Sequence, residues 1–240
     1  MNTALSISNL AKSYGKQNIL SGINLELLPG EFLGLVGVNG AGKTTLFKCL
    51  LDFTQVDAGS ISIFGLAHSR TKARENLVFL PEKFIPPYYL SGKDFLAYMH
   101  DLHGTKYDAV AVEEILAILD LDPVFIDKPV GQLSKGMSQK IGLAACLLSN
   151  KDLLVLDEPM SGLDPRARAY LKKYLLTLKE KGKTLFFSTH MLADVETLCD
   201  KVAVLHAGKI RFVGSPAECC SAYDTDDFEQ AYLRCVNAEA

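Results

Sequence analysis

The sequence lacks an apolar run long enough to cross a bilayer, since its hydrophobic stretches fall far short of the roughly 18–20 residues that a membrane helix needs. Its first residues, Met-Asn-Thr-Ala-Leu-Ser, also lack the charged start and long apolar stretch of a secretory signal. No internal repeat and no low-complexity segment is present. We therefore expect neither a membrane span nor a secretory signal in these 240 residues.

Excess positive charge and paired cysteine motifs are also missing. The formal net charge is −3, which leaves no basic surface to bind nucleic acid, so we expect no nucleic-acid partner. The six cysteines show no C-x-x-C spacing. Cys49 and Cys146 fall in apolar helical stretches and are expected to be buried, whereas Cys219-Cys220 is expected to be two reduced thiols rather than a metal site. This usage indicates a reducing cytosol.

One glycine-rich segment is present and informative. Residues 37–45 read Gly-Val-Asn-Gly-Ala-Gly-Lys-Thr-Thr, which is the G-x-x-x-x-G-K-[ST] pattern of a phosphate-binding loop. The glycines let backbone N–H groups approach a polyphosphate, Lys43 can reach its terminal phosphates, and Thr44 offers a hydroxyl to Mg²⁺. An apolar run at 32–36 predicts a strand before the loop, and a repeat from Leu46 to Leu51 predicts a helix after it. This order favours a nucleotide site over a glycine-rich turn with a surface lysine. The expected nucleotide contacts are Gly37, Asn39, Gly40, Ala41, Gly42, Lys43, Thr44 and Thr45.

A second apolar strand, residues 153–156, ends in two acids, Asp157 and Glu158. Acids at the carboxyl end of a strand lie where open α/β sheets bind ligands. We expect Asp157 to hold Mg²⁺, directly or through water, and Glu158 to lie near the terminal phosphate and polarise a water. The phosphate loop in the same chain disfavours the alternative, a solvated acidic turn.

Further short motifs occur in a fixed order around these two. Tyr14 lies in Lys-Ser-Tyr-Gly, Leu-Ser-Lys-Gly-Met-Ser-Gln occupies 133–139, Ser-Gly-Leu-Asp occupies 161–164, and Ser-Thr-His ends at His190. Together, over about residues 5–216, they resemble the nucleotide-binding subunit of ATP-binding cassette (ABC) transporters. Each motif alone is weak, but their common order is specific.

The resemblance implies a role for each motif. Ser134 and Gly136 would belong to the LSGGQ-like element that contacts the γ-phosphate of ATP bound to the other subunit. His190 would contact the γ-phosphate and act in catalysis with Glu158, and Asp164 would lie in the loop that communicates between the two sites. Tyr14 would stack on adenine, although an aromatic before a glycine is also common in turn packing. From the residues alone, Ser134 is also a good helix N-cap.

Two departures from the family pattern indicate a subgroup. Glu82 stands where the family usually has a glutamine near the nucleotide, and we expect it to contact the magnesium or its water. Lys135 and Met137 replace a glycine and a glutamine of the LSGGQ element. Both variants resemble an exporter-type (ABC-2-like) subgroup.

The fold class implied is α/β, a P-loop NTPase (RecA-like) core with an antiparallel β lobe and an inserted helical lobe. The 240 residues are expected to form one ATP-binding domain. The expected parts are the β lobe at 4–30 and 57–66, the core at 31–56 and 152–215, the helical lobe at 84–150 and the tail at 216–240. Helices are expected at Phe95–Leu102 (capped by Ser91 and ended by Gly104), Ala109–Leu119 (ended by Pro123) and Asp227–Cys235.

We therefore expect an ATPase that drives transport by a separate integral membrane permease, from the cytoplasmic face of the cell membrane. ATP and Mg²⁺ would be its cofactors, and a second copy or a related subunit would complete an ATP-dependent dimer. A regulatory or mechanical ABC-type ATPase that moves no substrate is the alternative. Residues 83–90, which contain Phe84, Ile85, Tyr88 and Tyr89, are expected to dock the membrane partner unless they pack internally between lobes.

Overall fold

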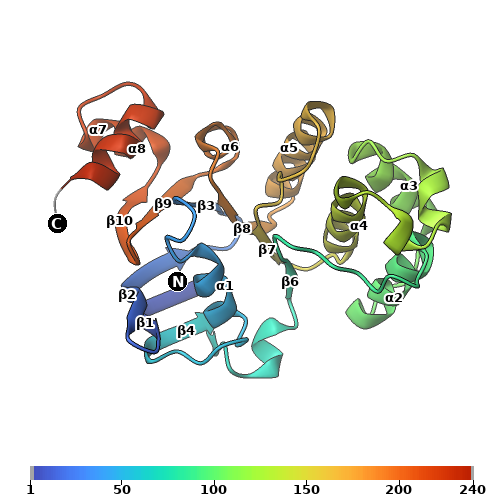
Figure 1. The fold of residues 1–240 in the computed structure, drawn as a ribbon, viewed down its shortest axis with the longest axis horizontal. Coiled ribbons are helices and arrows are strands. Elements are labelled where there is room, and N and C mark those ends of the chain that lie inside the picture. The colour runs from blue at the N-terminus through green and yellow to red at the C-terminus, as the bar shows by residue number, and fades with distance from the viewer. Residues whose placement is uncertain (1–2, 239–240) are drawn as a thin grey trace.

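The structure, a computed structural model, describes residues 3–238 and contains two β-sheets flanked by helices (Figure 1). The larger sheet has six strands in the order β10-β9-β3-β8-β7-β6. Its strands are β3 (Phe32–Val36), β6 (Leu77–Leu80), β7 (Leu153–Asp157), β8 (Thr184–Thr189), β9 (Lys201–His206) and β10 (Lys209–Gly214). Every residue of β3, β7 and β8 is buried, because helices or the second sheet cover both faces of these central strands. The α/β core expected from the sequence is confirmed.

Two edge strands of this sheet differ from the expectation. The sequence predicts a parallel core formed by residues 31–56 and 152–215. Strand β6 lies outside these two ranges, yet it belongs to the sheet and pairs in parallel with β7. At the other edge β10 runs antiparallel to β9. The turn between them, Ala207-Gly208, has positive φ at both residues, 47° and 74°, which is the geometry of a two-residue hairpin.

The smaller sheet is antiparallel, with the order β2-β1-β4-β5. Its strands are β1 (Leu5–Tyr14), β2 (Gln17–Leu27), β4 (Ala58–Ile63) and β5 (Leu66–Ala67). Helix α1 (Lys43–Leu50) contributes to the same apolar cluster as β1 and β8. The ring of Phe47 packs edge-on against Phe186 with 5.0 Å between centroids, so α1 and the loop that precedes it are held firmly between the sheets.

The chain between β6 and β7 forms a helical lobe at the far edge of the core sheet (Figure 1). It contains α2 (Gly92–His103), α3 (Ala109–Ile118) and α4 (Lys135–Leu148), with short 3₁₀ turns at Pro123–Asp127 and Val130–Gln132. Ser91 caps α2 and Gly104 ends it in a left-handed conformation, as expected. Pro123 does not end α3. It opens the next 3₁₀ turn, because its fixed φ suits a first helical position.

Four helices follow β7: α5 (Pro165–Glu180), α6 (Leu192–Leu198), α7 (Pro216–Ala222) and α8 (Phe228–Asn237). Asp227 caps α8, which matches the helix expected in the tail. Both α7 and α8 pack through Cys219, Phe228 and Cys235 against the β9 side of the core. All six cysteines are free, and Cys49 and Cys146 are buried as expected. Among residues 3–238, no helix has the length and apolarity to span a bilayer.

Candidate active site

The phosphate-loop residues lie between β3 and α1, where the sequence pattern places them. Gly40 and Gly42 have φ of 84° and 114°, a conformation open to glycine. Gly37 is needed for space, because a Cβ there would lie 2.4 Å from the carbonyl oxygen of Leu205. No side chain caps α1, so its first N–H groups are available to an anion. The loop therefore has the backbone of an anion-binding site.

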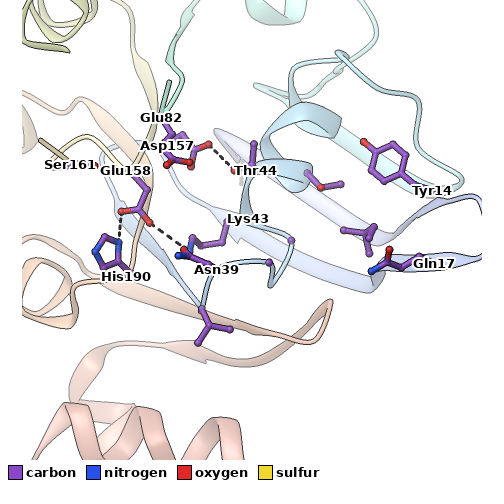
Figure 2. A pocket seen from close by; sticks show the side chains of 15 residues that line it. Tyr14, Gln17, Asn39, Lys43, Thr44, Glu82, Asp157, Glu158, Ser161 and His190 are labelled. Atoms are coloured by element: carbon purple, nitrogen blue, oxygen red, sulfur yellow. Dashed lines mark hydrogen bonds and ion pairs between the residues drawn. The ribbon is translucent and has the colours of Figure 1, made fainter. Parts of the chain in front are cut away.

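Lys43 connects this loop to the acids at the end of β7. Its Nζ donates to the carbonyl oxygen of Gly37 at 2.6 Å and lies 3.6 Å from Oε1 of Glu158. The side chain is nearly buried, which strengthens its interaction with any charge placed beside it. Figure 2 shows Lys43 pointing toward Glu158 and His190.

Asp157 is almost fully buried and has two hydroxyl partners. Thr44 donates its Oγ1 proton at 3.0 Å, and Ser188 of β8 donates at 2.5 Å. Burial raises the pKa of Asp157 above its usual value, the two hydroxyl bonds lower it, and the nearby Glu82 and Glu158 raise it again. Carboxylate and hydroxyl oxygens with excess negative charge favour the binding of a hard divalent cation, which neutralises that charge.

Glu158 is held in an unusual backbone conformation, with φ of 50°. Its N–H donates to Oγ of Ser188 at 2.9 Å, so Ser188 holds both Asp157, the last residue of β7, and Glu158, which follows it. The carboxylate accepts a hydrogen bond from Nδ1 of His190 at 2.9 Å. A non-glycine residue at positive φ, kept there by buried contacts, is typical of functional sites.

These groups line one cavity of about 560 Å³ (Figure 2). Tyr14 lies at the far end from Glu158, 48% exposed, with the ammonium of Lys12 5.3 Å from its ring centroid. Of the expected site residues, the cavity brings together Tyr14, Asn39, Gly40, Gly42, Lys43, Thr44, Thr45, Glu82, Asp157, Glu158 and His190. Gly37 and Ala41 support the loop from behind and do not line the cavity.

Four lining residues were not expected: Gln17, Ile19, Val38 and Ser161. Gln17 is the cross-strand partner of Tyr14 across a two-residue turn, so a hairpin assignment for 14–17 would have found it. Val38 lies inside the 37–45 loop and Ser161 opens the Ser-Gly-Leu-Asp motif, so both belong to segments with a sequence signal. Ile19 carries no such signal, and only the fold brings it to the cavity.

Three expected residues lie away from the cavity within this chain. Ser134 is an exposed N-cap of α4 and accepts a hydrogen bond from the N–H of Met137 at 3.2 Å. Gly136 follows it in the first turn. Asp164 caps α5 by accepting from the N–H of Ala167 at 2.9 Å and pairs with Lys140. None of the three is among the residues that line the cavity.

A phosphate loop opening a helix, and a buried acidic strand end facing it across one cavity, define a P-loop nucleotide-binding protein. Similarity to known proteins identifies the family within this class. The ABC transporter family matches residues 20–161, which is more than half of the chain, and the chain belongs to that family. ATP binding follows from this membership.

Individual relatives include ATP-binding proteins named for export. The lantibiotic transport ATP-binding protein SrtF of Streptococcus pyogenes is 38% identical over 86% of this chain and 88% of its own. The Nod factor export ATP-binding protein I of Rhizobium etli is 34% identical over 89% of this chain and 69% of its own. An uncharacterised ABC transporter ATP-binding protein of Synechocystis is 38% identical over 85% of this chain, which spans only 58% of that relative's length.

A solved structure of an ATP-binding subunit of an ABC transporter superposes with a TM-score of 0.89 at 27% identity, over 97% of this chain and 99% of that one. The likeness therefore extends over both sheets and the helical lobe, and is not confined to the phosphate loop.

Proposed function

We propose that the protein is the ATP-hydrolysing subunit of an export system and powers a separate integral membrane permease. The observation that carries the proposal is the Lys43–Glu158–His190 contact at the phosphate-loop end of the cavity. These groups supply a cation for the terminal phosphates, a carboxylate to polarise water and an imidazole to orient that carboxylate. The relatives named for export support the direction of transport.

The oxygen groups beside the phosphate loop fit Mg²⁺. Thr44 and Asp157 would hold the ion, with Glu82 bound to it or to its water, and the ion would supply charge stabilisation at the phosphates. Within residues 3–238, no group of three His, Cys, Asp or Glu side chains is arranged to hold a metal. Phosphate oxygens and water would therefore complete its shell, as is usual for Mg²⁺.

A second copy of the chain, or a related subunit, would complete each site. Ser134 and Gly136 open α4 outside the cavity of their own chain. The Ser134 helix start, with its free N–H groups, suits the γ-phosphate of a nucleotide held by a partner. Asp164 would lie at the same interface and communicate between the two sites. Closure of such a dimer would shield the reaction from bulk solvent while keeping the attacking water, and hydrolysis would reopen it.

The membrane partner would dock at the segment 83–90, on the cytoplasmic face of the membrane. Ile85, Tyr88 and Tyr89 are 86%, 74% and 70% exposed, and the two tyrosine rings meet edge-on at 5.5 Å. Phe84 turns inward instead and packs on Phe95. Exposed aromatic anchors on a proline-stiffened segment are typical of binding hot spots.

The experiment that tests the proposed function is Glu158→Gln. The amide keeps the size of the side chain and removes the basic oxygen, so we expect ATP binding to persist while turnover falls by about a hundredfold or more. Phosphate release measures turnover, and titration with a fluorescent nucleotide measures binding. Glu180→Gln, at an exposed position on α5, is the matched control and should retain wild-type turnover. Near-normal turnover in Glu158→Gln would remove Glu158 from the proposed role.

A further inference from the structure

The loop from Glu158 to Asp164 joins the acidic end of β7 to the start of α5. Near one end, the N–H of Ser161 donates to the carbonyl oxygen of Glu158 at 3.0 Å, and Ser161 lines the cavity. At the other end, Asp164 caps α5 through the N–H of Ala167. Because only two residues separate Ser161 from Asp164, we expect a displacement of Asp164 to reach Ser161.

Lys140, a buried cation on α4 of the helical lobe, contacts this loop. Lys140 is 7% exposed, and its Nζ donates to the carbonyl oxygen of Asp120 at 2.9 Å and to Oδ2 of Asp164 at 3.0 Å. The ammonium thus connects a carbonyl oxygen of the helical lobe, that of Asp120, to a carboxylate of the core, that of Asp164. A buried ammonium needs such partners, so its position is fixed by them.

A second contact on the same face of α4 fixes the spacing between helix and loop. A Cβ at Gly136 would lie 2.9 Å from the carbonyl oxygen of Gly162. Gly136 and Lys140 are four residues apart, so they lie one above the other on the helix. The helix that begins at Ser134 therefore touches the loop at two successive points within one chain.

The Asp164 carboxylate is charged throughout the neutral range. The N–H of Ala167 and the Lys140 ammonium lower its pKa to about 2. The link between lobe and loop is thus a charged pair at working pH, with one partner buried. Arg166 lies 3.5 Å from the Asp120 carboxylate, but its exposed side chain makes that contact weak.

We propose that Lys140 is a positioning residue for ATP hydrolysis, which holds the loop from Ser161 to Asp164 at the cavity and makes it follow movements of the helical lobe. The inference rests on the proposed ATPase function. Lys140 touches no cavity residue itself, so loss of its charge should reduce the chemical step and leave nucleotide binding nearly unchanged.

The test compares Lys140→Met with Lys183→Met in the full chain. Lys183 is a matched control because its Nζ also donates to a backbone carbonyl oxygen, that of Asn150 at 2.9 Å, and to an aspartate, Asp152 at 3.2 Å. We expect Lys140→Met to lower kcat for ATP about tenfold with less than about a twofold change in nucleotide Kd, and Lys183→Met to change neither. Lys140→Arg should restore at least about half of the turnover, because it keeps the charge and the reach.

A double-mutant cycle with Asp164→Asn separates positioning from general structure. If Lys140 acts through Asp164, the kcat losses of the two single variants will not add in the double variant. Additive losses, or equal kcat for Lys140→Met and Lys183→Met, would overturn the inference. Lys140→Gln replaces Lys140→Met if the methionine variant does not fold, with the same expected loss. A wild-type chain without ATPase activity when its partner subunit and permease are present would instead refute the proposed function.

Discussion

Replacing Asp194 with alanine should destabilise the fold more than any surface change of the same type. Asp194 lies on α6 with a fully buried side chain, and two cations of α5 reach it. Arg168 donates through Nε at 3.2 Å, and Nζ of Lys172 lies 2.7 Å away. Both cations are 21% exposed, so Asp194→Ala would leave two partly buried positive charges without a counterion.

The size of the effect follows from this burial. Removal of one partner from a buried ion pair costs about 3–5 kcal/mol, and we take about 3 kcal/mol because both cations keep some contact with water. For a chain of this size the melting temperature should fall by about 6–12 °C. Differential scanning calorimetry measures it. The control is Asp152→Ala, which removes a 59% exposed partner of Lys183 and should cost less than about 1 kcal/mol. Equal shifts for the two variants would refute the assigned difference in burial.

Other predictions concern the nucleotide, the dimer and the partner. Lys43→Ala should weaken ATP binding in a nucleotide titration. Mixing Lys43→Ala subunits with Ser134→Arg subunits should return some ATPase activity, because each mixed dimer keeps one intact composite site. No recovery of activity would contradict a contact of Ser134 with the nucleotide of the other subunit. Replacing Tyr88 and Tyr89 with alanine should lower the yield of the membrane complex but not ATP binding; a lower melting temperature of the lone subunit with normal assembly would indicate core packing instead. Asp164→Asn should change acid stability: its pKa is lowered on folding, so its contribution is complete above about pH 3.8 and is lost toward about pH 2. Urea midpoints from pH 5 to 2 should therefore fall less steeply in Asp164→Asn than in the wild type.

The parts of the site that sequence analysis could predict are those with local causes. The spacing of Gly37, Gly42 and Lys43 is a property of nine consecutive residues, and the flanking apolar runs predict the strand and helix that hold them. Ser134 and Asp227 were predictable as helix caps for the same reason, since a cap depends on its next three residues.

The parts that could not be predicted depend on distant segments. Two sets of ion pairs depend on how whole helices pack, which the pattern of a single sequence does not show. They are the pairs of Asp194 with Arg168 and Lys172, and the pair of Lys140 with Asp164. Helix α7 is a different case. Ser215 and Glu218 form a capping box that was visible in the sequence but falls in a segment without a long apolar repeat.

The placement of the helical lobe between β6 and β7 has a consequence for how the chain folds. These two strands are parallel neighbours in the sheet, where Leu77 pairs with Leu153. In the sequence, however, the whole helical lobe lies between them. Closing an unstructured loop of that length costs about 4 kcal/mol in chain entropy before any contact of the β6 edge is gained. A lobe already folded around α2 and α4 would bring its two ends together and reduce that cost. We therefore expect local helix formation to precede closure of this edge, so that the sheet is completed late.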